Sequence, residues 1–169
     1  MKNILRFITI LPLMFACAQE QKKQDERPNI LLIMADDMGY SDIASFGSEI
    51  STPNLDKLAS GGLKMSNFHA GPACSITRTM LLSGADSHRS GMGTMYNDQV
   101  VNQLGQPGYE GYMNEDVVSV STLLQDVGYN TYMTGKWHLG YNEEQSPKAR
   151  GFDQSFVLLQ GGSGHFDDR

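Results

Sequence analysis

The strongest constraint on the fold is a short apolar run near the start of the chain. Residues 29–34 read NILLIM, with Pro28 before them and a pair of aspartates shortly after them. A run of this length is typical of a strand that is buried on both faces, and such strands occur in parallel sheets covered by helices. We therefore expect this segment to lie inside an α/β sheet.

Predicted helices and strands alternate along the rest of the chain. Thr52 and Pro53 fit the start of a helix as an N-cap and a first-turn residue, and Gly61-Gly62 ends it. Further helices are predicted at residues 75–83 and 119–127, and further strands at residues 63–68, 129–133 and 154–159. This alternation indicates an α/β fold. Residues 85–115 show no periodicity, and we expect a long loop over a functional site.

The start of the chain has the features of an export signal followed by a linker. Residues 1–16 carry Lys2 and Arg6 ahead of an apolar stretch of about ten residues, too short to span a bilayer. The Ala16-Cys17 junction resembles a bacterial lipoprotein box, and an ordinary signal peptide with an incidental cysteine is the alternative. Residues 17–27 are then a lipidated cysteine and a polar linker, and residues 28–169 the folded domain. We expect an exported protein, periplasmic or at the outer membrane or cell surface of a bacterium, attached to a membrane only through a lipid on Cys17.

Composition and cysteine usage narrow the function. Hydrophobic residues make up 40% and charged residues 19%, as in globular proteins. The formal net charge of -6 argues against nucleic-acid binding, which needs clustered Lys and Arg. The two cysteines are Cys17 and Cys74. If Cys17 carries lipid, Cys74 has no disulfide partner, which is unusual in an exported protein; Cys74 is then either buried and inert or chemically used.

The first candidate site follows the predicted strand 29–34. Asp36 and Asp37 stand where ligands bind in open α/β sheets, beyond the carboxyl end of a strand. Two adjacent carboxylates repel each other unless a cation compensates them, and hard oxygen ligands suit Ca²⁺ or Mg²⁺. The alternative is that one aspartate caps the following turn, which Gly39 makes.

The second candidate site is Cys74 with Arg78. If Cys74 lies at a helix N-terminus, backbone N–H groups and the helix dipole favour an anion beside it. Arg78 lies four residues on, hence on the same helix face, and its guanidinium suits a sulfate or phosphate group. The alternative is a buried cysteine and a surface arginine.

The third candidate site is Lys136 with His138. These residues alternate around Trp137 between Gly135 and Gly140, so in extended backbone they face the same way. A cation and a proton carrier that project together suit the cleavage of an anionic ester. The alternative is an exposed loop anchored by Trp137.

Taken together and in this order, these clusters resemble the sulfatase family, and in particular bacterial arylsulfatases. The resemblance covers residues 28–165. Its segments are Pro28-Asn29-Ile30 through Asp36-Asp37-Met38-Gly39, Thr52-Pro53-Asn54-Leu55-Asp56, Pro72-Ala73-Cys74-Ser75-Ile76-Thr77-Arg78, Gly91-Met92-Gly93-Thr94-Met95, Gly128-Tyr129-Asn130-Thr131, Gly135-Lys136-Trp137-His138-Leu139-Gly140 and Gly151-Phe152-Asp153. The resemblance implies the N-terminal part of an alkaline-phosphatase-like sandwich, with a largely parallel central sheet flanked by helices.

The resemblance also implies a metal and a modified nucleophile. Asp36 and Asp37 match carboxylates that bind a metal, usually Ca²⁺, with Mg²⁺ as the alternative. Cys74 matches the residue that a maturation enzyme oxidises to formylglycine (3-oxoalanine), whose hydrate attacks sulfur and also coordinates the metal. A geminal diol can attack with one hydroxyl, and the other can then expel sulfate and restore the aldehyde.

The remaining residues match groups around the sulfate. Arg78 matches the group that holds the modified residue and neutralises charge. Lys136 and His138 match residues that bind sulfate and tune the hydrate. The family's remaining metal ligands have no match here, so we expect the N-terminal part of a longer enzyme, inactive alone.

One position departs from the family pattern Cys-x-Pro-x-Arg, because Ile76 stands where the family has proline. Proline fixes φ and restricts its neighbour, so the segment presented to the maturation enzyme differs.

Three functions stay open. They are a sulfuric ester hydrolase acting on aryl or carbohydrate sulfates, a phosphonate or phosphate monoester hydrolase of the same superfamily, and an inactive module that binds anions or glycans.

Overall fold

The structure is a computed structural model that describes residues 27–164 and residue 166. The predicted signal peptide at 1–16, the lipid-bearing Cys17 and most of the linker lie outside the described residues. The chain divides into two units, one ending at Ala35 and one beginning at Asp36. Within the described ranges, no helix is both long and apolar enough to cross a membrane.

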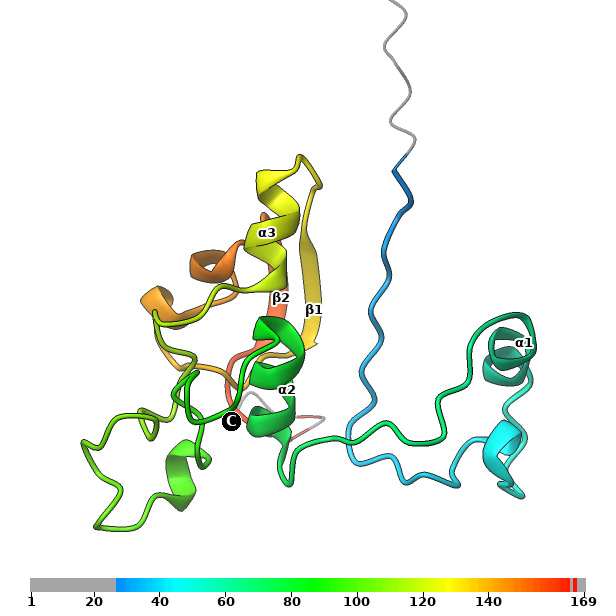
Figure 1. Ribbon diagram of the computed structural model, residues 1–169, viewed down its shortest axis with the longest axis horizontal. Helices are drawn as coiled ribbons and strands as arrows, with labels where there is room; N and C mark the ends of the chain where they lie inside the picture. The colour runs from blue at the N-terminus through cyan, green and yellow to red at the C-terminus, as the bar shows by residue number, and fades with distance from the viewer. Residues whose placement is uncertain (1–26, 165, 167–169) are drawn as a thin grey trace, which may run out of the picture. The chain divides into compact units, whose positions relative to one another are not determined.

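A small parallel sheet organises the second unit (Figure 1). Strand β1, Tyr132–Lys136, pairs in parallel with β2, Gln154–Leu158, with Tyr132 opposite Gln154 and Lys136 opposite Leu158. The crossover between them contains the short 3-10 helices η3, Glu143–Gln145, and η4, Lys148–Arg150. Parallel strands require such a crossover, so the α/β prediction is confirmed for this part of the chain.

Two helices pack beside this strand pair. Helix α2 is Cys74–Ser83 and helix α3 is Val120–Asp126, and the two contact each other. Both helices predicted here, at 75–83 and 119–127, are present to within one residue at each end. Gly84 terminates α2 in the left-handed conformation, with its N–H bonded to the Met80 carbonyl, and the Ser119 hydroxyl caps α3 by accepting from the Ser121 N–H. Both features are local, which explains why sequence patterns predicted the helices.

The core lies where α2, the residues after β1 and the long loop meet. Trp137 and Leu139, just beyond β1, are fully buried with Met92 and Met113 of the loop, and Leu82 of α2 joins them. The loop prediction for 85–115 is confirmed in that its regular structure is one 3-10 turn, η2, Tyr96–Asp98. The loop nevertheless contributes core side chains and is not merely a surface connection.

The segment around α1, Pro53–Gly61, is held by local contacts with η1, Ala44–Phe46. Thr52 occupies the N-cap position as predicted, but it makes no capping hydrogen bond to α1. Its hydroxyl accepts from the Ala44 N–H at 2.9 Å and donates to Asp56 at 3.1 Å. The hydroxyl thus joins η1 to α1 instead.

Two predicted strands are wrong as local structure. Residues 29–34 have no regular secondary structure, and Ile30, Leu31 and Ile33 are 60%, 84% and 71% exposed. Residues 63–68 likewise form no strand. A strand needs neighbours for its N–H and C=O groups, and the described residues contain no strands besides β1 and β2. The apolar pattern indicates a preference for burial, but no strand among the described residues pairs with these segments.

The strand predicted at 129–133 lies three residues later, at Tyr132–Lys136. Thr131 explains the shift. Its backbone N–H donates to the Asp153 carboxylate at 2.7 Å instead of to a neighbouring strand, and its hydroxyl donates to the Gly151 carbonyl. The strand therefore runs through Gly135, which adopts φ 102, and ends at Lys136. The shift matters because it places Lys136 and His138 at the carboxyl end of β1.

Replacing Gly151 in the crossover would test how tightly α3 packs against this segment. Gly151 has φ 86, and a Cβ there would lie 2.5 Å from the Thr122 backbone nitrogen, whereas Gly105 has φ 73 and nothing within 4 Å. A side chain in left-handed backbone costs about 1–2 kcal/mol at either position. We expect Gly151→Ala to lower the free energy of unfolding by clearly more than Gly105→Ala, measured by urea denaturation. Equal losses would show that the crossover is free to move.

Candidate active site

Helix α2 places Cys74 at its first position. Ala73 before it is extended, with φ -149 and ψ 165, and the first helical hydrogen bond runs from the Thr77 N–H to the Ala73 carbonyl. Cys74 is half-buried and forms no disulfide in the structure. The N–H groups of the first turn have no partners within the helix, so the environment of the thiol favours an anion. The predicted helix N-terminus at Cys74 is therefore confirmed.

Arg78, one turn along α2, is buried rather than exposed. Its side chain is 10% exposed, and Nη1 donates to the Lys136 carbonyl at 2.5 Å. Nη2 lies 3.8 Å from Asp36 Oδ1. These contacts do not fit the alternative of a surface arginine, because the guanidinium joins α2 to the end of β1.

Lys136 brings a second cation to the same carboxylate. Its Nζ lies 3.2 Å from Asp36 Oδ2, and the lysine side chain is 14% exposed. Asp36 is 52% exposed, so water weakens both of its ion pairs. The structure thus brings Asp36, Arg78 and Lys136 together, although 42 residues separate the first from the second.

Asp37 is placed differently from Asp36. It is exposed and has φ 53, a left-handed conformation that is uncommon for residues other than glycine. The turn after it is closed by Asp42, whose carboxylate accepts from the Gly39 N–H at 2.6 Å. Neither Asp36 nor Asp37 makes a hydrogen bond to that turn within the described residues. The capping alternative for the aspartate pair is therefore not what the structure shows.

His138 sits just beyond β1 in an unusual backbone conformation. Its φ is 57, its N–H donates to the Leu159 carbonyl at 3.0 Å, and it is buried. Burial lowers the pKa of His138 below its usual 6.5, and the positive charges of Lys136 and Arg78 lower it further. The ring is therefore mainly neutral at pH 7. Its buried Nδ1 has no hydrogen-bond partner among the described residues.

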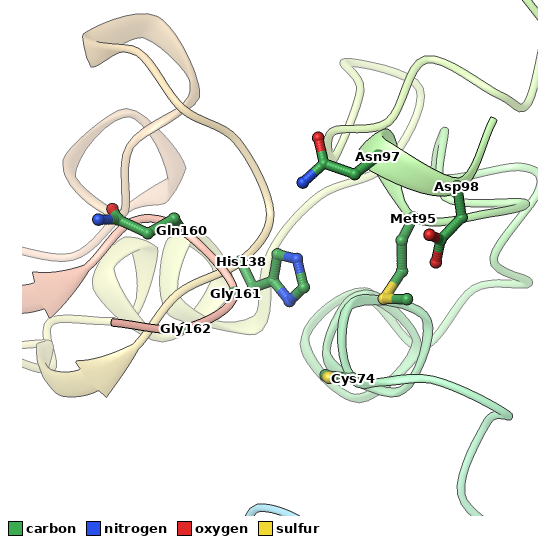
Figure 2. Close-up of a pocket in the computed structure, with 8 residues that line it drawn as sticks. All are labelled: Cys74, Met95, Asn97, Asp98, His138, Gln160, Gly161 and Gly162. Carbon is green, nitrogen blue, oxygen red and sulfur yellow. The ribbon is translucent and has the colours of Figure 1, made fainter. Parts of the chain in front are cut away.

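A pocket of about 400 Å³ joins Cys74 and His138 (Figure 2). Met95, Asn97 and Asp98 line it on one side of the imidazole, and Gln160, Gly161 and Gly162 line it on the other. This is the size of pockets that bind small molecules. The pocket therefore contains one residue from each of two predicted sites, Cys74 and His138, whereas Arg78, Lys136, Asp36 and Asp37 do not line it.

Sequence reasoning missed six lining residues, namely Met95, Asn97, Asp98, Gln160, Gly161 and Gly162. The first three belong to a loop without periodicity, so no local signal identified them. Gly161 is the most restrictive: a Cβ there would lie 2.5 Å from His138 Cε1 and 2.6 Å from Nε2. The glycine run was visible in the sequence, but its contact with the imidazole was not.

The two aspartates fit part of a divalent cation site. Carboxylate oxygens suit Ca²⁺ or Mg²⁺, and Ca²⁺ takes about 6 to 8 oxygen ligands. Two carboxylates offer at most about four oxygens, and the described residues contain no cluster of three or more His, Cys, Asp or Glu side chains that would hold a metal. Asp36 and Asp37 can therefore provide some ligands of a cation, with the rest coming from elsewhere.

The contact between Gly161 and His138 leads to a prediction about the imidazole. Gly161→Ala should displace the ring from its buried position and so raise the pKa of His138 toward 6.5, because burial is the largest cause of its lowering. Gly162→Ala is the matched control, since nothing lies within 4 Å of a Cβ there. The pKa is measured by NMR titration of the ring, assigned with His138→Gln. An unchanged pKa in Gly161→Ala would contradict the packing described.

Comparisons with known proteins agree with this arrangement. The family model described as Sulfatase matches residues 28–169. An uncharacterized sulfatase of Schizosaccharomyces pombe is 48% identical over 154 residues, which cover 88% of this chain and 27% of that protein. An arylsulfatase of Klebsiella aerogenes is 45% identical over 145 residues, covering 86% of this chain and 31% of that protein.

A solved structure is also similar. The crystal structure of Ps i-CgsB matches with a TM-score of 0.70 and 35% identity, covering 83% of this chain and 30% of that one. The same protein in complex with k-i-k-neocarrahexaose matches with a TM-score of 0.64 and 31% identity, covering 83% and 30%. The chain thus spans about a third or less of the length of the proteins that it matches.

Proposed function

This chain belongs to the sulfatase family, and on that basis we propose a function for the full-length protein. We propose that it is a sulfuric ester hydrolase whose nucleophile is a formylglycine made from Cys74. The observation that carries the proposal is the position of Cys74. It begins α2, it lines a pocket with His138, and the buried Arg78 guanidinium lies one turn behind it. A cysteine in that position can be both modified and reached by a substrate.

In this proposal, different residues in and near the pocket have different roles in ester cleavage. Arg78 and Lys136 provide positive charge for a sulfate group, and Arg78 also fixes α2 against the end of β1. Neutral His138 lines the pocket and can accept a proton there. A formylglycine hydrate would supply two hydroxyls, one for attack on sulfur and one for release of sulfate. A Ca²⁺ or Mg²⁺ ion at Asp36 and Asp37 would offset negative charge on the sulfate oxygens.

The fold of the full-length protein is part of this proposal. We place the chain in an alkaline-phosphatase-like sandwich whose largely parallel central sheet is flanked by helices. Exposed apolar side chains support this: residues 30–33 are 56–84% exposed, and Phe156 on β2 is 86% exposed. Further strands would cover such surfaces. The remaining metal ligands would come from the portion of the full-length protein that also supplies those strands, so residues 1–169 alone would be inactive.

The substrate class is an aryl or carbohydrate sulfate. The arylsulfatase of Klebsiella aerogenes supports the first, and the neocarrahexaose complex of Ps i-CgsB supports the second. The main rival is a phosphonate or phosphate monoester hydrolase of the same superfamily. Turnover of 4-nitrophenyl sulfate, 4-nitrophenyl phosphate and 4-nitrophenyl phenylphosphonate by the full-length protein decides between the two functions. All three substrates release 4-nitrophenol, so their rates can be compared directly.

The modification of Cys74 is testable directly. In full-length protein co-expressed with a formylglycine-generating enzyme, the tryptic peptide from Met65 to Arg78 should carry formylglycine, and Cys74→Ala should abolish sulfatase turnover. An unmodified thiolate lacks the second hydroxyl that releases sulfate, so it would stall after one turnover. Mass spectrometry of the peptide, together with the turnover number, makes the measurement. Multiple turnover with an unmodified Cys74 would exclude the formylglycine mechanism, and an unmodified, inactive protein would favour the anion- or glycan-binding module.

Ile76→Pro is the informative companion variant. Ile76 is the third residue of α2, so its N–H precedes the first helical hydrogen bond, and a proline there removes none. If the departure at this position impairs maturation, the modified fraction should rise without loss of folding. The same peptide mass reports the result.

The proposed location is the bacterial cell envelope, with Cys17 as a lipid anchor. The support is the apolar stretch and the Ala16-Cys17 junction, which lie outside the described residues. Cys17→Ser should move the protein from the membrane fraction to the soluble fraction of the native host, measured by immunoblotting after fractionation. Identical fractionation of the two proteins would leave an ordinary signal peptide as the explanation.

A further inference from the structure

Asp36 makes contacts that its neighbour Asp37 does not share. Its two carboxylate oxygens lie 3.4 Å and 3.2 Å from the Lys136 ammonium, and one of them lies 3.8 Å from Nη2 of Arg78. We propose that Asp36 is an exchangeable counter-ion: it holds the Lys136 ammonium away from the sulfate, and it releases the ammonium when a divalent cation binds the same carboxylate. This inference rests on the proposed function and adds a means of regulation to its site.

The Lys136 side chain is placed beside the pocket and not in it. Lys136 ends β1, two residues before His138, and its charge acts on the imidazole. His138 nevertheless lines the pocket, whereas Lys136 does not, because its ammonium lies at the Asp36 carboxylate. A lysine side chain has a flexible four-carbon stem. Rotation of this stem can therefore carry the ammonium from the carboxylate to an anion beside His138, with no change in the backbone.

The ion pair between Asp36 and Lys136 is weak enough to be exchanged. The Asp36 side chain is 52% exposed, so water screens its attraction to the ammonium. Ca²⁺ carries twice the charge of an ammonium and approaches carboxylate oxygens to about 2.3–2.6 Å. This is closer than the 3.2 Å of the ion pair. A divalent cation therefore competes well for the Asp36 carboxylate, and its charge then repels the ammonium.

Arg78 is held in a second way that the exchange does not disturb. Its Nη1 donates to the Lys136 carbonyl at 2.5 Å, and this bond does not involve Asp36. The Arg78 side chain is 10% exposed, so it has little room to leave. A cation at Asp36 would therefore release the lysine ammonium while the guanidinium keeps α2 joined to the end of β1.

Asp37 provides the matched comparison for Asp36. It carries the same charge at the next position of the chain, it is exposed, and within residues 27–164 it forms no ion pair. Both aspartates are proposed cation ligands, but Asp36 is the one that contacts Lys136. A difference between variants of the two residues therefore separates the exchange from the general effect of a negative charge on a nearby anion.

The first experiment measures the affinity of the full-length matured protein for inorganic sulfate, by calorimetry in the presence of EDTA. Asp36→Asn should bind sulfate about two- to fivefold more tightly than the unchanged protein, because the lysine is no longer held by a carboxylate. Asp37→Asn should give a clearly smaller gain. When Lys136→Gln is already present, adding Asp36→Asn should give no more than the gain of Asp37→Asn, because the excess depends on the lysine.

Calcium binding tests the exchange from the other side. Lys136→Gln should raise the Ca²⁺ affinity of the full-length protein, because the cation no longer has to displace an ammonium. Lys148→Gln is the control, since Lys148 is an exposed lysine in the crossover, and it should leave the Ca²⁺ affinity unchanged.

Three results would overturn the exchange. They are equal sulfate gains in Asp36→Asn and Asp37→Asn, an excess gain that survives without Lys136, and an unchanged Ca²⁺ affinity in Lys136→Gln. The last result applies even if Asp36→Asn does not fold. None of these measurements needs turnover, so a protein that passes them and still hydrolyses no sulfate ester contradicts the proposed function and not the exchange.

Discussion

The site depends on the bond between the Arg78 guanidinium and the Lys136 carbonyl. A charged donor on a backbone carbonyl contributes about 1.5–3 kcal/mol, and here it joins two elements that are 58 residues apart in the chain. It sets α2 against the carboxyl end of β1. Cys74 lies one turn before Arg78, and His138 lies two residues after Lys136. Both residues therefore come to line the same pocket. The same guanidinium approaches Asp36, so one residue relates all three clusters.

Core packing holds the other side of the pocket in place. The Met113 N–H donates to the Leu139 carbonyl at 3.0 Å, and both side chains are fully buried. Arg150 in turn donates to the Met113 carbonyl and binds Glu115 at 2.8 Å. These bonds attach the long loop to the residues that follow β1. The loop is thus fixed at its base, and Asn97 and Asp98 of η2 line the pocket.

The helices were predicted well, whereas the four predicted strands had mixed outcomes: residues 154–159 are confirmed as β2, residues 129–133 are shifted to β1, and residues 29–34 and 63–68 form no strand. The signals for α2 and α3 are local: Gly84 ends one helix and Ser119 caps the other, so a short stretch of sequence contains the whole explanation. A strand exists only when another segment pairs with it. β1 and β2 have each other, whereas residues 29–34 have no partner in the described structure despite the strongest apolar pattern in the chain. β1 also begins later than predicted, because the Thr131 N–H donates to the Asp153 carboxylate in the distant crossover and not to a strand.

The sequence by itself determined the chemistry available to this protein. A cysteine before a helix, an arginine one turn later, an aspartate pair and the Lys-Trp-His segment are each defined by neighbours within a few residues. Tertiary structure decided which of these groups meet and what surrounds them. Asp36 pairs with Arg78 and Lys136, while Asp37 next to it remains exposed. Asn97, Asp98 and Gln160 reach the pocket from segments that carry no periodic signal. The reason is that local sequence fixes backbone preferences over a few residues, whereas a pocket is made by long-range contacts that fix where those residues lie.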